Sequence, residues 1–112
     1  MINKYSKIYI AGHKGMVGSA CWRLFESLGF LNLIGRTSKE LDLRDQVEVK
    51  TFFKSQKPDY VIDAAARVGG IITNKENLYN FLIDNTQIQN NLIKSSLNFD
   101  VKKFIFLGSS CI

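Results

Sequence analysis

The chain of 112 residues is long enough for one small domain with a buried core and too short for two. Its residues are 46% hydrophobic and 22% charged, with one proline, which excludes a disordered or low-complexity polypeptide. The net charge of +5 suits a polyanionic ligand such as a dinucleotide or a nucleotide sugar, although lysines scattered over a solvated surface give the same balance.

The first predicted strand covers residues 7–11 (KIYIA), which are β-branched and aromatic. A glycine-rich loop follows, and then a helix that is expected to end at Gly29. Its apolar positions recur at helical spacing: Val17, Cys21, Leu24 and Leu28. A second strand is expected at residues 31–35 (LNLIG), so the chain begins as strand, loop, helix and strand.

Asp45 is placed to cap a second helix, which is expected to end at Lys57 because Pro58 follows. The apolar residues of this helix are Val47, Val49, Phe52 and Phe53. Residues 60–66 (YVIDAAA) then predict a third strand that runs into a loop of small residues.

A long amphipathic helix is predicted over residues 78–97, followed by a fourth strand over residues 103–108 (KFIFLG). Strands that alternate with helices and are apolar throughout indicate a parallel sheet covered on both faces. The expected fold is therefore α/β, a Rossmann-type doubly wound parallel sheet with strand order 3-2-1-4. We expect residues 1–112 to form a single domain, incomplete because it stops after the fourth strand.

The segment after the first strand, AGHKGMVG, spaces Gly12, Gly15 and Gly18 as GxxGxxG. Between a strand and a helix, such glycines permit a tight turn, let backbone amides approach a pyrophosphate and let the helix pack closely on the strand. The phosphates would lie at the helix N-terminus, which favours negative charge. The segment predicts a dinucleotide site, with a purely structural turn as the alternative, and His13 is expected to have no catalytic role.

The end of the second strand reads IGRTSK and lacks the carboxylate that an NAD site uses to hold the ribose 2′-hydroxyl. Arg36 can instead pair with a 2′-phosphate and stack on adenine, helped by Lys14 in the glycine loop. The sequence therefore favours NADP over NAD and a single NADP-binding domain. The alternative for Arg36 is an ordinary surface arginine at a strand end.

Several other partners are not expected. The basic residues are not clustered with stacking aromatics, which disfavours nucleic acid, and no apolar run approaches the ~18 residues needed to span a membrane. The start of the chain lacks the features of a signal peptide, so a cytoplasmic location is expected. Cys21 and Cys111 are far apart without a CxxC or histidine cluster, so no metal site is predicted, and Cys21 is assigned to the core.

Four separated motifs agree with one known family: GxxGxxG after the first strand, LDL after the second, AAARVGG after the third and GSSCI after the fourth. In this order they resemble the extended short-chain dehydrogenases, and within them the GDP-L-fucose synthase family. The resemblance spans nearly the whole chain but only about the first third of the family's usual length. It implies NADP as cofactor, a nucleotide sugar as substrate and a homodimer for the full-length family. Ser38 stands where some members have a second basic residue, which leaves Arg36 as the main 2′-phosphate ligand.

The resemblance also assigns roles along the chain. It implies a pyrophosphate loop lined by Gly12, Lys14, Gly15, Met16 and Val17, an adenine end contacted by Asp42 and Leu43, and a cofactor floor made by Ala64, Ala65 and Ala66. Ser109 would hydrogen-bond the C4 carbonyl oxygen of the substrate, Ser110 would bind substrate, and Cys111 would transfer protons.

The implied reaction converts GDP-4-keto-6-deoxy-D-mannose to GDP-L-fucose by 3,5-epimerisation and NADPH-dependent 4-reduction. The C4 ketone acidifies the C–H bonds at C3 and C5, so a thiolate such as that of Cys111 can remove a proton before hydride reduces the ketone. That role needs a lowered thiol pKa, and a buried inert cysteine is the alternative.

The family's reductase also uses a YxxxK pair, and a histidine partners its cysteine. No YxxxK follows Ser110, so the chain by itself is expected to be inactive. Two alternatives stay open: a truncated, non-catalytic module that binds NADP, and a related enzyme that acts on another nucleotide sugar, such as a GDP-deoxyheptose.

Overall fold

The computed structural model describes residues 2–65 and 75–107, with the backbone alone for residues 75–79 and 81. Within these ranges one parallel sheet contains β1 (Lys7–Ala11), β2 (Asn32–Ile34), β3 (Tyr60–Asp63) and β4 (Lys103–Phe106). Its helices are α1 (Met16–Ser27), α2 (Gln46–Gln56) and α3 (Lys75–Asn98). The elements alternate as predicted, and α3 begins three residues earlier than expected. The fold is a Rossmann-type doubly wound α/β sheet.

The strand order is β2-β1-β3-β4, so the expected order 3-2-1-4 is wrong. That order would place the second strand inside the sheet, but β2 has only three residues and an exposed Asn32, whereas β3 is almost entirely buried. Residues 35–45 form a loop, and the chain then passes to the other side of β1. The sheet therefore reverses its direction of winding after β2, one strand earlier than predicted.

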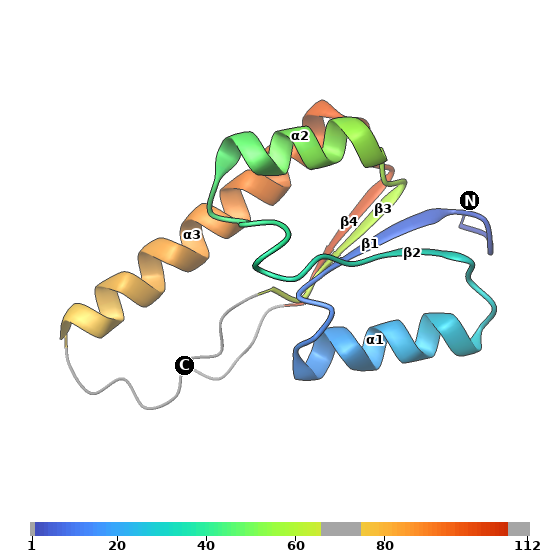
Figure 1. Ribbon diagram of the computed structural model, residues 1–112, viewed down its shortest axis with the longest axis horizontal. Coiled ribbons are helices and arrows are strands. Elements are labelled where there is room, and N and C mark those ends of the chain that lie inside the picture. Colours follow the sequence, from blue (N-terminus) through green and yellow to red (C-terminus); the bar gives the residue numbers. More distant parts are fainter. Residues whose placement is uncertain (1, 66–74, 108–112) are drawn as a thin grey trace.

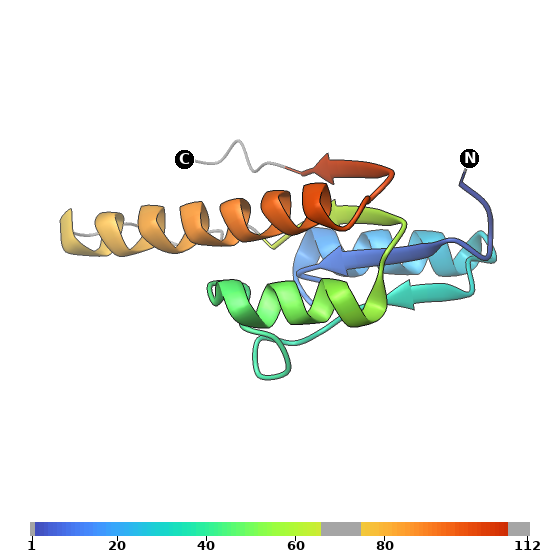
Figure 2. The ribbon, with the colours of Figure 1, turned by 90° about the horizontal axis from the view of Figure 1, so that it is seen from above.

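This reversal decides which face each helix covers. Because parallel crossovers are almost always right-handed, a change of direction moves the next helix to the opposite face of the sheet. Figure 1 shows α1 on one face and α2 and α3 together on the other. Seen from above, α3 extends beyond the carboxyl ends of the strands (Figure 2). None of the helices in the described parts is long and apolar enough to cross a membrane.

The ends of α2 follow from its local sequence. The Asp45 side chain accepts hydrogen bonds from the backbone N–H groups of Val47 and Glu48, at 2.9 and 3.2 Å, which satisfies two donors that the helix leaves free. The helix stops at Lys57, which adopts a left-handed conformation (φ 47°) directly before the buried Pro58. The predicted cap and stop are both confirmed.

Each face of the sheet has its own core, because successive strand residues point to opposite faces. The core under α2 and α3 comprises Tyr9, Ala11, Leu41, Val49, Phe52, Phe53, Val61, Ile88 and Leu92. On the α1 face, Ile8, Ile10 and Ile62 are buried, and they are covered by partly buried side chains that include Cys21, Trp22, Phe25 and Phe30.

The apolar positions that predict α1 are mostly not its buried face. Val17, Leu24 and Leu28 are 52%, 57% and 62% exposed, whereas Trp22 and Phe25 pack on the sheet. The aromatic rings cover more of the isoleucine layer than the leucines would, because each ring buries a larger area. Cys21, assigned to the core, is partly buried there.

Candidate cofactor-binding site

The glycine loop after β1 contacts the segment after β3. Gly12 has a φ of +76°, and a Cβ atom added to it would lie 2.5 Å from the Ala64 carbonyl oxygen and 2.7 Å from the Ala65 Cα. Any other residue would therefore be strained and would also clash with backbone. The Gly15 N–H donates to the Gly12 carbonyl oxygen at 3.0 Å and closes the turn. The loop thus lies between the ends of β1 and β3, where the winding reverses and where open α/β sheets bind ligands.

The other two glycines have different tasks. Gly18 is buried in the first turn of α1, and a Cβ there would run into the backbone of Gly12 and His13, so the helix packs directly on the loop. Gly15 caps α1 without a side-chain hydrogen bond from the described residues, and the first turn contains no acidic residue. The N–H groups at this end are therefore suited to an anion.

A pocket of about 400 Å³ lies beside this contact. It is lined by residues from the glycine loop, the 36–44 segment, the turn after β3 and α3: Gly12, Arg36, Ser38, Leu41, Asp42, Leu43, Arg44, Ala65 and Ile88. Apolar walls with a few charged groups, in a cavity of this size, are typical of sites for small molecules. The structure thus brings together five of the predicted cofactor residues: Gly12, Arg36, Asp42, Leu43 and Ala65.

Arg36 is half-buried at the end of β2. Its guanidinium carbon lies 5.4 Å from the centroid of the Phe52 ring, and Nη1 donates to the Gly35 carbonyl oxygen at 2.8 Å. The described part of the chain offers it no carboxylate within ion-pair distance. Stacking fixes the plane of the guanidinium and leaves its charge available to an anionic ligand.

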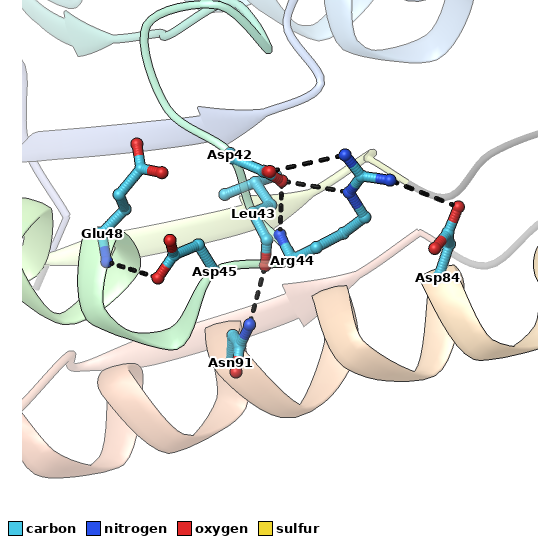
Figure 3. Close-up of polar contacts among 7 residues, drawn as sticks. All are labelled: Asp42, Leu43, Arg44, Asp45, Glu48, Asp84 and Asn91. Carbon is cyan, nitrogen blue, oxygen red and sulfur yellow. Dashed lines mark hydrogen bonds and ion pairs between the residues drawn. The ribbon is translucent and has the colours of Figure 1, made fainter.

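Arg44, the second arginine of the pocket, is already paired (Figure 3). Its Nε donates to Asp42 Oδ1 at 3.1 Å and its Nη2 to Asp42 Oδ2 at 3.4 Å, while Nη1 lies 3.7 Å from Oδ2 of Asp84 in α3. Hydrogen bonds from Arg44 lower the pKa of Asp42, and the same contacts raise the pKa of Arg44. Two carboxylates thus offset the charge of Arg44, in contrast to Arg36.

The turn after β3 is held by a buried carboxylate that the sequence analysis did not single out. Asp63 is fully buried, and its Oδ1 accepts the N–H of Ala65 at 3.0 Å. This bond fixes the turn that places Ala64 and Ala65 against Gly12. Burial raises the pKa of the Asp63 carboxyl. An aspartate within an otherwise apolar strand was the available signal.

His13 packs behind the loop rather than in the pocket. Its ring lies 5.4 Å from the Trp22 ring, and a Cβ added to Gly35 would come within 2.6 Å of it. Burial, followed by the nearby charge of Lys14, lowers the pKa of His13. These contacts give His13 a packing role between the glycine loop, Gly35 and α1.

Other predicted site residues lie elsewhere. Lys14, Met16 and Val17 are exposed around the start of α1, and they do not line the pocket. The remaining predicted residues fall outside the described residues: Ala66, Ser109, Ser110 and Cys111. Four lining residues were not predicted from the sequence: Ser38, Leu41, Arg44 and Ile88. Ile88 comes from α3, and only the fold brings it here. The ranges that the structure describes hold no group of side chains suited to a metal ion.

The glycine loop, the reversal between β1 and β3 and the pocket beside it define a Rossmann-type fold with a pocket at its switch point. The chain belongs to the NAD dependent epimerase/dehydratase family, whose signature matches residues 8–112.

Particular relatives narrow this class. The chain is 51% identical over 112 residues to GDP-L-fucose synthase 1 of Arabidopsis thaliana and 46% identical over 106 residues to GDP-L-fucose synthase of Escherichia coli (strain K12). These matches cover 100% and 95% of this chain, and 35% and 33% of those proteins. A GDP-mannoheptose C4 reductase from Campylobacter jejuni, solved with NADP bound, matches with a TM-score of 0.91 and 42% identity, over 96% of this chain and 32% of its own. The chain thus spans about a third of the length of the relatives it matches.

Proposed function

We propose that this chain is the NADP-binding N-terminal part of an enzyme like the GDP-L-fucose synthases. The enzyme would convert GDP-4-keto-6-deoxy-D-mannose to GDP-L-fucose by epimerisation at C3 and C5 and NADPH-dependent reduction at C4. One observation carries the cofactor assignment: Arg36, without a counter-ion in the described residues, shares a pocket with Gly12 of the glycine loop. The identity to GDP-L-fucose synthases over the whole chain supports the choice of reaction.

The residues present fit NADP. The apolar side chains of Leu41, Ala65 and Ile88 would hold the adenosine in the pocket, and Arg36 would pair with the 2′-phosphate from its end of β2. The only acidic residue of the described lining is Asp42, which Arg44 already binds, so no free carboxylate repels the phosphate.

The start of α1 with Gly12 and Gly15 would hold the pyrophosphate, because the lack of side chains lets backbone N–H groups approach it. Gly18 keeps the helix close enough for this contact, and the exposed Lys14 adds a positive charge beside it. Met16 and Val17 border the same helix start.

The reacting groups are proposed from the sequence that follows β4. β4 runs parallel to β3 and β1, so its carboxyl end lies at the same edge of the sheet as the glycine loop. Ser109 would donate a hydrogen bond to the C4 oxygen, and Cys111 would remove and return protons at C3 and C5, with Ser110 in the substrate site. When bound, NADPH supplies the hydride that reduces C4.

A second candidate is favoured by the solved structures. The Campylobacter jejuni enzyme with a TM-score of 0.91 acts, by its name, on a GDP-mannoheptose, so the second candidate substrate is a GDP-heptose. Both candidates share the cofactor site and a nucleotide-sugar substrate. A module that binds NADP without catalysis is the third outcome of the experiments below.

The cofactor assignment is tested by titrating NADPH and NADH, followed by nicotinamide fluorescence. We expect Arg36→Ala to raise the Kd for NADPH by about 10-fold to 100-fold, because it removes a charge-assisted hydrogen bond, and to change the Kd for NADH by less than about threefold. Arg23 is an exposed arginine of α1, so Arg23→Ala is the matched control. It should change neither the Kd for NADPH nor the Kd for NADH. Equal losses for both cofactors would contradict the role of Arg36.

The reaction is tested with the full-length protein and NADPH. Consumption of NADPH with GDP-4-keto-6-deoxy-D-mannose, but not with a GDP-4-keto-heptose, supports the first candidate, and the reverse supports the second. Cys111→Ser should suppress deuterium uptake from solvent at C3 and C5, since the thiol is the proposed base. NADPH binding without turnover of either sugar would leave only the binding module.

A further inference from the structure

We propose that Arg44 is a positioning residue of this pocket: it holds the Asp42 carboxylate against the pocket wall, so that the site selects a base with an exocyclic amino group. The inference rests on the proposed NADP site and adds to it a determinant of base specificity. Asp42 and Arg44 both line the pocket, but their bonds to each other give them unequal roles.

Arg44 donates hydrogen bonds to both carboxylate oxygens of Asp42. Oδ1 of Asp42 accepts the backbone N–H of Arg44 at 3.0 Å and its Nε at 3.1 Å, and Oδ2 accepts Nη2 at 3.4 Å. A carboxylate offers about four lone-pair positions, so this arrangement leaves about one of them, on Oδ2, for a ligand. Since the guanidinium is planar, its two side-chain bonds fix the plane of the carboxylate as well as its place.

The same segment is tied to α3 at two points (Figure 3). Nη1 of Arg44 lies 3.7 Å from Asp84 Oδ2, and Asn91, about two helical turns further along α3, donates from Nδ2 to the Leu43 carbonyl oxygen at 2.9 Å. These contacts hold the wall of the pocket that residues 42–44 form. The side chains of Arg44 and Asp84 are 50% and 18% exposed. Ion pairs with such exposure add little to stability, so position is the larger contribution.

The chemistry of an ionised carboxylate explains the selectivity. It only accepts hydrogen bonds, so it binds the 6-amino group of adenine and repels the 6-oxo oxygen of hypoxanthine. An aspartate is ionised near neutral pH with or without Arg44, so the arginine supplies direction rather than charge state. A direct contact of Arg44 with the 2′-phosphate is disfavoured, because Asp42 and Asp84 already offset its charge.

The experiment compares NADPH with its hypoxanthine analogue, in which a 6-oxo group replaces the 6-amino group, and with NADH. We expect the full-length protein to bind NADPH about 10-fold more tightly than the analogue, since one charged hydrogen bond is lost. Arg44→Gln should reduce this preference to about twofold and weaken NADPH and NADH by the same factor. Arg44→Lys keeps the positive charge but lacks the planar guanidinium that binds both carboxylate oxygens. This variant should therefore lose the preference for NADPH over the analogue too.

Two further variants separate position from fold and charge. Asp84→Asn breaks the link to α3 and should give an intermediate loss of preference, while Arg23→Gln removes the same charge elsewhere and should keep the full preference. A preference unchanged in Arg44→Gln and Arg44→Lys overturns the inference and leaves the NADP site standing. A loss confined to NADPH and its analogue, with NADH spared, also overturns it, since Arg44 would then bind the 2′-phosphate. A wild-type protein that binds no NADPH overturns the proposed function and this inference together.

Discussion

On the face of the sheet under α2 and α3, the described side chains form a continuous core of nine buried residues, whereas on the α1 face only three isoleucines are buried. The core under α2 and α3 also forms part of the pocket wall, because Leu41 belongs to the core and to the pocket lining. The thinner side supplies close backbone packing at Gly18. The larger core indicates that most of the stability comes from one face, while the shape of the glycine loop depends on the other.

Two phenylalanines provide the largest expected contrast between the faces. Phe53 of α2 is fully buried with edge contacts to Tyr9 and Phe52, whereas Phe25 of α1 is only partly buried against Phe30. Phe53→Ala should lower the free energy of unfolding by about 3–5 kcal/mol, and Phe25→Ala by about half as much, because less area is lost. Urea denaturation measures both values. Equal losses would contradict the unequal division of stability.

Gly18→Ala should show the second function of the α1 face. The added methyl group meets the backbone of Gly12, so the helix must move away from the loop, which we expect to cost about 1–3 kcal/mol of stability and about 10-fold in NADPH affinity. Gly15→Ala is the matched control for stability: its Cβ would lie 3.4 Å from the Gly12 carbonyl oxygen, an ordinary contact, so the change should stay within about 0.5 kcal/mol. If both variants unfold at the same urea concentration, close packing at Gly18 is not required.

Asp63 gives the smallest effect, and one that depends on pH. Its pKa is raised by burial in the folded protein, so the folded state binds the proton more readily than the unfolded chain. The resulting stability is complete below the unfolded pKa of about 3.9 and is lost as the pH rises through the higher folded pKa. Asp63→Asn keeps an oxygen that can accept the Ala65 N–H but does not ionise.

Urea denaturation at several pH values compares the wild type with Asp63→Asn. We expect the stability of the wild type, relative to the variant, to fall as the pH rises from about 4 toward 7. A constant difference over this range would show that Asp63 does not titrate differently on folding.

Local sequence was sufficient for the elements and for part of the site. Asp45 and Pro58 fixed the ends of α2, because a cap and a proline act on their immediate neighbours. The spacing of Gly12, Gly15 and Gly18 predicted a glycine loop. Glycine is required at two of these positions, Gly12 and Gly18, because a Cβ atom there would clash with neighbouring backbone. Arg36 was found because the second strand of such a fold ends beside the loop.

Features that depend on contacts between distant segments could be established only from the tertiary structure. The order β2-β1-β3-β4 depends on which strands are buried on both sides of the sheet. The apolar segments of the sequence predict the strands but not which of them lies at the edge. The face of α1 that packs was decided by Trp22 and Phe25, because their rings cover the isoleucines better than the periodic leucines do.

The sequence by itself determined the class of fold and the glycine loop, and it pointed to Arg36 as the proposed 2′-phosphate ligand, since each depends on residues close together along the chain. Only the tertiary structure decided that Arg44 reaches a second carboxylate, Asp84, and that Arg36 has no ion-pair partner among the described residues, because Asp84 lies on a helix 40 residues further along the chain. The same holds for Asp63, whose burial follows from its place between β1 and β4. Charge state and availability depend on neighbours that only folding brings near.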